Sequence, residues 1–189
     1  FIFVPLQSGN DAQITLHAPF TNRGFIAEIA RVFADSALPV VFKLHPRDNQ
    51  RQHTERLLRR VIDNNRFLVV DGSVDLLCRR AAVVVTQNSS AAIDAFFQGR
   101  VVVHCGEALF QNCGATIYNP DLAAGFRQFQ SLSDVQLASL RDRQQRFLTW
   151  LRDSYCTPWS GDVDGFVRRI TLQIDAMRRR GAAPYCRTE

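Results

Sequence analysis

Five short apolar segments alternate with longer segments of helical periodicity over the first 104 residues. The apolar segments are rich in Val, Ile, Leu and Phe and cover residues 1–6, 39–44, 66–70, 82–87 and 100–104. Near-continuous apolar strands separated by helices are typical of a parallel sheet that is covered on both faces and has right-handed crossovers. The pattern predicts an α/β fold, namely a Rossmann-like parallel sheet of order 3-2-1-4-5 covered by helices.

Amphipathic helices are expected over residues 22–36 and 49–63, where apolar positions recur at helical spacing. From residue 106 to about residue 131, glycine and proline interrupt any period. This segment is predicted to be a long loop with at most one short strand, near residues 116–118.

Two further amphipathic helices are expected at the C-terminal end. Ser133 can cap a helix over residues 134–155, and a last helix begins near Val163 and carries Arg178–Arg180 at its negative end. We divide the chain into a nucleotide-sugar-binding domain over 1–132, C-terminal helices packed on it over 133–180, and a disordered tail over 181–189.

Composition excludes several classes of protein. Apolar residues make up 46% and charged residues 22% of the 189 residues, which excludes a disordered or low-complexity chain. The five cysteines form no C-x-x-C pair, which argues against a disulfide framework and a zinc ribbon. No apolar run is long enough to cross a membrane and no export signal is present, so a cytoplasmic protein with reduced thiols is expected. The chain starts without Met inside an apolar strand, so we expect the natural protein to extend further.

The net charge of +5 favours acidic partners. The basic residues are not interleaved with aromatic residues as in RNA-binding signatures, so nucleic acid is not expected as a partner. Lys43 is the single lysine among 23 basic residues and ends an apolar strand. A compact ammonium at that position is suited to contact a phosphate, although chance can also place one lysine there.

Ligands of open parallel sheets bind beyond the carboxyl ends of the strands, where the strand order reverses. This rule selects four segments, which we expect to meet at one crevice. They are Gln7–Asp11, Lys43–Pro46, Thr86–Ser90 and Cys105–Glu107.

Asn88, Ser89 and Ser90 precede a helix, so free backbone N–H groups and two hydroxyls are available to a phosphate. The alternative is that Asn88 or Ser89 only caps the helix. Asp94 faces either the crevice or a solvent channel. There is no G-x-G-x-x-G and no P-loop motif, which argues against a nicotinamide cofactor and excludes a P-loop nucleotide site.

His45 precedes Pro46, so its backbone is restricted to an extended conformation at the end of a strand. An imidazole held there can donate to a leaving phosphate. The four histidines form no H-E-x-x-H motif or tight cluster, so no metal and no cofactor are expected.

Three motifs in this order resemble the bacterial capsule-polysaccharide β-Kdo transferases. They are Val4-Pro5-Leu6-Gln7-Ser8-Gly9-Asn10-Asp11-Ala12-Gln13-Ile14, Phe42-Lys43-Leu44-His45-Pro46 and Thr86-Gln87-Asn88-Ser89-Ser90. The resemblance covers about residues 1–120. It implies the C-terminal, nucleotide-binding half of a GT-B glycosyltransferase, with the N-terminal GT-B domain outside this chain. It further implies a CMP-Kdo donor and a glycolipid or oligosaccharide acceptor.

Roles for individual residues follow from this resemblance. Asp11 is the candidate nucleophile of a retaining double displacement, with an Asx turn as the alternative, and His45 is the second catalytic candidate. Binding of the donor nucleotide is expected from Gln7, Gln13, Lys43, His45, Pro46, Asn88, Ser89, Ser90, Asp94 and Gly106.

Two other functions stay open. The His-Pro segment and the Ser-Ser helix start also resemble a CDP-glycerol-type polyol phosphotransferase of GT-B fold, and Asp94 fits that pattern. The third possibility is a non-catalytic sugar-nucleotide-binding module. The arginines of the last helix also suggest adhesion to an anionic membrane surface at the inner face of the inner membrane.

Overall fold

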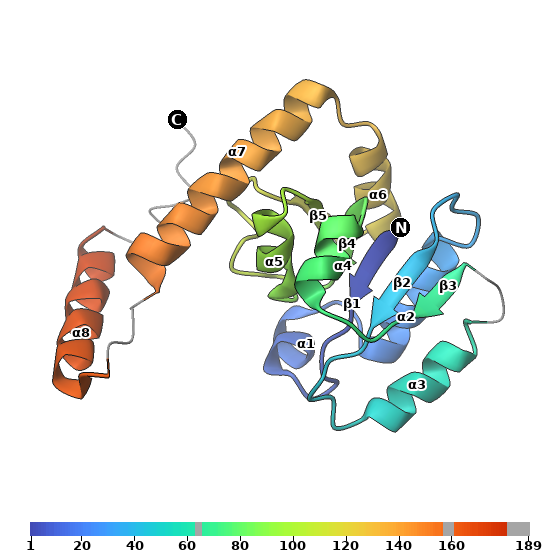
Figure 1. Cartoon of the computed structure of the whole chain (residues 1–189), viewed down its shortest axis with the longest axis horizontal. Coiled ribbons are helices and arrows are strands. Elements are labelled where there is room, and N and C mark those ends of the chain that lie inside the picture. Colours follow the sequence, from blue (N-terminus) through green and yellow to red (C-terminus); the bar gives the residue numbers. More distant parts are fainter. Residues whose placement is uncertain (63–65, 157–160, 181–189) are drawn as a thin grey trace.

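The computed structural model describes residues 1–62, 66–156 and 161–180 (Figure 1). Its centre is a six-stranded parallel sheet of order β3-β2-β1-β4-β5-β6. The strands are β1 (Ile2–Pro5), β2 (Val40–Lys43), β3 (Phe67–Val69), β4 (Val83–Thr86), β5 (Val101–His104) and β6 (Ile117–Tyr118). The predicted order 3-2-1-4-5 is confirmed, and β6 adds one short strand beside β5.

Helices cover both faces of the sheet because alternate strand residues point to opposite sides (Figure 1). Ile2 and Val4 join one apolar core, whereas Phe3 joins the other. The first core is covered by α2 (Asn22–Val32), α3 (Arg51–Arg59) and α6 (Leu122–Gln130). The second is covered by α4 (Val74–Arg80), α5 (Ala91–Phe97) and α7 (Asp134–Trp150). Each fully buried large apolar side chain contributes roughly 1.5–3 kcal/mol.

A short helix that the sequence analysis does not assign, α1 (Ala12–His17), follows β1. Its end lies against the loop after β5, where the Glu107 N–H donates to the His17 carbonyl over 2.8 Å. Gly106 makes this approach possible, since a Cβ at Gly106 would lie 2.9 Å from the His17 carbonyl oxygen. The glycine is therefore needed for close backbone packing.

The prediction of a long loop from residue 106 to 131 is wrong in its second half, which forms α6. Asp121 caps this helix by accepting from the Ala123 and Ala124 N–H groups at 2.9 and 3.2 Å. Gly125 does not break the helix. A Cβ there would lie 3.0 Å from Val103 and 3.2 Å from Asn119, so the glycine lets α6 approach the sheet closely.

The helix predicted over residues 134–155 is α7 followed by a turn of π-helix, η1 (Leu151–Tyr155). Ser133 caps α7 as predicted, and Gln136 completes a capping box with it. Gln144 is completely buried and donates to the carbonyls of Arg100 and Ala115. This amide fixes α7 against the start of β5 and the segment before β6.

The last helix, α8 (Val163–Arg180), lies beyond the far end of α7 and away from the sheet (Figure 1). Val163 and Val167, two apolar residues of this helix, are more than half exposed. The packing of the C-terminal helices on the domain stays a prediction. The domain division at residue 132 stays a prediction, and the tail 181–189 lies outside the described residues. Within the described chain, no helix is both long and apolar enough to cross a membrane.

His104 is a buried polar residue at the end of β5. Its Nδ1 lies 3.0 Å from the Gly106 carbonyl and its Nε2 lies 3.0 Å from the Thr116 hydroxyl. Burial lowers the pKa of His104 to about 4, while the contact with the Gly106 carbonyl acts in the opposite direction. The imidazole is therefore neutral in the folded protein at pH 7.

We predict that the fold loses stability as the pH falls from 6.5 to 4. In this range His104 binds a proton in the unfolded chain, whereas the buried His104 of the folded protein stays neutral. Each pKa unit corresponds to 1.36 kcal/mol, which gives about 3 kcal/mol over this range. Denaturant unfolding at several pH values measures the loss. A His104→Gln variant should show a flatter profile; an identical slope in both proteins would contradict the prediction.

We further predict that Gly106→Ala destabilises the fold by about 1–3 kcal/mol, because the added methyl meets only backbone atoms. Gly72→Ala is the matched control, since a Cβ there has nothing within 4 Å. Thermal unfolding of both variants measures the difference. Equal melting temperatures for the two variants would show that α1 moves away at no cost.

Candidate functional site

The loop after β1 leads directly into α1, and Asp11 is the residue that joins them. Its Oδ1 accepts from the Gln13 N–H at 2.9 Å, so Asp11 caps α1. This contact corresponds to the alternative of a turn-forming aspartate; the nucleophile role stays a prediction. Gln7 is buried, and its carbonyl accepts from Asn22 Nδ2 at 2.7 Å.

The loop after β4 uses most of its own hydroxyls to build the turn into α5. Thr86 Oγ1 accepts from the Ser89 N–H, and Ser89 Oγ accepts from the Ala91 N–H, each at 3.2 Å. Ser90 is the N-cap residue, but its side chain makes no capping bond and is exposed. Of the two serines, Ser90 thus presents its hydroxyl to solvent.

The segment after β2 fixes the tautomer of His45. Its Nδ1 accepts from the Arg47 N–H at 3.1 Å, so the neutral ring carries its proton on Nε2. Pro46 follows it and is exposed. Lys43 is mostly buried, and its Nζ lies 3.5 Å from Asp71 Oδ1, so this ammonium has a carboxylate neighbour.

Hydrogen bonds join the four loops, as the expected convergence requires. The Leu6 N–H donates to the Lys43 carbonyl, and Asn88 Nδ2 donates to the Gln13 carbonyl. The Gly106 N–H in turn donates to the Gln87 carbonyl at 2.9 Å. The loops after β1, β2, β4 and β5 therefore meet at one edge of the sheet.

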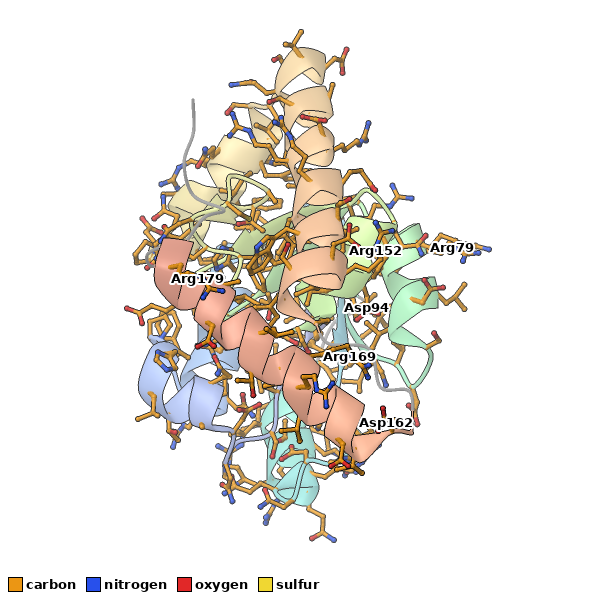
Figure 2. The ribbon with its side chains drawn as sticks, turned by 90° about the vertical axis from the view of Figure 1, so that its left-hand side faces the viewer. Arg79, Asp94, Arg152, Asp162, Arg169 and Arg179 are labelled. Atoms are coloured by element: carbon orange, nitrogen blue, oxygen red, sulfur yellow. The ribbon has the colours of Figure 1, made fainter. Side chains whose placement is uncertain are left out.

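Asp94 lies on α5 in a half-buried position between α5 and α4 (Figure 2). Burial raises the pKa of Asp94, and the negative charge of Asp75 on α4 raises it further. Asp75 accepts from Gln98 Nε2 at 2.5 Å and from Arg79 Nη2 at 3.1 Å. Gln98 and Arg79 thus hold the Asp75 carboxylate in place beside Asp94.

Three buried amide atoms around these loops have no hydrogen-bond partner in the described part of the chain. They are Asn22 Oδ1, Gln87 Nε2 and Asn88 Oδ1. Buried polar atoms nearly always have a partner. Ordered water or a ligand can supply it at this edge of the sheet.

Sequence reasoning missed the segment that follows β3. Asp71 approaches Lys43, and Gly72 beside it faces open space. The rule about carboxyl ends of strands includes this segment when it is applied to every strand. Among the described residues, no three His, Cys, Asp or Glu side chains gather in a way that could hold a metal ion.

Solved structures share this fold. The β-Kdo 2,7 transferase KpsC of Thermosulfurimonas dismutans has 22% identity and a TM-score of 0.50, and the match covers 66% of this chain and 44% of that one. The UDP-GlcNAc 2-epimerase of Methanocaldococcus jannaschii has 13% identity and a TM-score of 0.53, with 79% and 45% covered. MnaA of S. aureus, solved with UDP, has 8% identity and a TM-score of 0.52, with 80% and 44% covered.

This chain thus spans less than half the length of these three proteins. A comparison with curated protein sequences gives no match. A family model described as capsule polysaccharide biosynthesis protein matches residues 1–143, which include all four loops. The chain therefore belongs to the capsule polysaccharide biosynthesis protein family.

Proposed function

We propose that this chain is the nucleotide-binding half of a capsule glycosyltransferase, and that its donor is CMP-Kdo. The strongest support is the set of hydrogen bonds that joins the loops after β1, β2, β4 and β5 at one edge of the sheet. Open parallel sheets bind their ligands at this edge. Membership of the capsule family supports a nucleotide-sugar donor and a glycolipid or oligosaccharide acceptor.

In this proposal the CMP phosphate lies between His45 and Ser90. The Nε2–H of His45 donates to it, since Nδ1 is already occupied by the Arg47 N–H. The exposed Ser90 hydroxyl is a second donor. Lys43 adds a positive charge near the phosphate, and the negative charge of Asp71 partly offsets it. Donors fixed before the reaction stabilise a leaving phosphate without reorganising.

Asp11 is the proposed nucleophile. Its Oδ1 is held by the Gln13 N–H, which orients the carboxylate, and its second oxygen attacks the anomeric carbon. The bond from that carbon to the CMP phosphate breaks, and the electron pair leaves with the phosphate. The acceptor hydroxyl, deprotonated by a base, then displaces Asp11 and restores its carboxylate. Two inversions give net retention.

Adhesion to an anionic membrane is a further part of the proposal. Arg168 and Arg179 are exposed on α8, and each cation near such a surface contributes about 1 kcal/mol. A lipid-linked acceptor would then be close to the enzyme at the inner face of the inner membrane.

We predict that His45→Ala in the complete protein weakens CMP binding and slows transfer, since one fixed donor is lost. The loss of such a donor costs about 2.7–4 kcal/mol in the transition state. Calorimetric titration with CMP and turnover of CMP-Kdo measure the two effects. His53→Ala, at an exposed histidine of α3, is the matched control and should change neither. Turnover of CDP-glycerol but not CMP-Kdo would favour a polyol phosphotransferase instead.

We also predict that Asp11→Ala abolishes transfer while CMP still binds, because the contacts proposed for CMP come from other loops. Trapping the wild-type enzyme with CMP-Kdo should add the mass of Kdo to the peptide that contains Asp11, as read by peptide mapping. An adduct on a different carboxylate would contradict the nucleophile role and leave Asp11 with only its role as the N-cap of α1. Loss of the N-cap should lower the free energy of unfolding by about 1 kcal/mol, and thermal unfolding of the variant checks that the protein is still folded.

A further inference from the structure

A hollow lies at the same edge of the sheet, at the opposite end of α1 from Asp11. Its volume is about 260 Å³, and it is lined by the end of α1, the loop after β5 and the segment at β6. The lining includes Leu16, His17, Glu107, Tyr118 and Pro120. None of the roles proposed above uses these five side chains.

One wall of the hollow is a polar pair. His17 Nδ1 lies 3.2 Å from Glu107 Oε2, and the Glu107 N–H donates to the His17 carbonyl at 2.8 Å. The two residues are thus joined through both backbone and side chains. Their side chains are 42% and 67% exposed, so their outer polar atoms are accessible to a ligand. Because a carboxylate only accepts, His17 Nδ1 is the donor in this contact, which leaves Nε2 of a neutral ring and the outer oxygen of Glu107 as acceptors for a ligand's hydroxyls.

The rest of the lining is largely apolar. Tyr118 lies with its ring against His104, with centroids 5.1 Å apart. His104 is itself held by Gly106 and Thr116, so the tyrosine ring rests on a fixed support. Leu16 and Pro120 complete the apolar lining. A site built before the ligand arrives loses little entropy on binding.

This combination selects the class of ligand. A hollow lined by an aromatic ring and by paired hydrogen-bonding groups matches a pyranose, which has C–H groups on its faces and hydroxyls at its edge. The negative charge of the Glu107 carboxylate repels a phosphate, which favours a neutral ligand. The volume lies just below the range of drug-sized sites, so it suits a single ring better than a nucleotide.

We propose that this hollow is a binding subsite for one neutral sugar unit of the glycan on which the enzyme acts. The identity of that sugar as part of the glycan rests on the proposed function, whereas the binding of a pyranose does not. The six residues of α1 separate the two sites by about 9 Å along the helix. A short oligosaccharide can span this distance, with one unit in the hollow and its end near Asp11.

The test is saturation-transfer NMR on the complete protein, with methyl glycosides of glucose, galactose and N-acetylglucosamine as probes and CMP as a separate ligand. At least one glycoside should bind, and His17→Gln and Glu107→Gln should each weaken it at least fivefold while CMP binding is unchanged. His53→Gln is the matched control and should leave both unchanged. The exposed side chain of Glu107 makes Glu107→Gln the variant to rely on if His17→Gln fails to fold.

Failure of each proposal has its own signature. If CMP binds but no glycoside does, or if glycoside binding is the same in the variants and the wild type, the subsite is refuted and the proposed function stands. If a glycoside binds through His17 and Glu107 but CMP does not bind, the subsite stands and the proposed nucleotide site is refuted.

Discussion

The parallel pairing of β1 with both β2 and β4 is the constraint on which the candidate site depends. Ile2 and Phe3 pair with Val40 and Val41 on one side and with Val83 and Val84 on the other. This register brings the carboxyl ends of three strands from distant parts of the sequence to one edge. All strands run in the same direction, but their order reverses at β1: β2 and β3 lie on one side of it and β4, β5 and β6 on the other. The connections on the two sides therefore diverge and leave this edge accessible.

The core that supports this edge was predictable because its signal is strong. Buried parallel strands are apolar at nearly every position, and five such segments occur with helical segments between them. The carboxyl-end rule then selects Lys43, His45 and Ser90 without any knowledge of side-chain positions. Sequence alone thus located the edge of the sheet where polar residues gather.

What the sequence did not reveal depends on contacts between distant segments. Gly125 reads as a helix breaker, but its lack of a Cβ allows α6 to pack on Val103. The six residues of α1 are too few to show a period, and only the cap by Asp11 marks its start. Likewise, the ion pair between Lys43 and Asp71 joins the ends of two strands, which no local pattern encodes.

The short outer strands limit pairing of the sheet with strands of other molecules. β3 has three residues and β6 has two, so each open edge of the sheet exposes only a short row of unpaired backbone groups. Long, flat edges are templates for pairing with strands of another chain, and short edges are a common protection against it. Leu68 and Val69 of β3 are partly exposed, but the short edge strands make aggregation by addition of further strands to this sheet unfavourable.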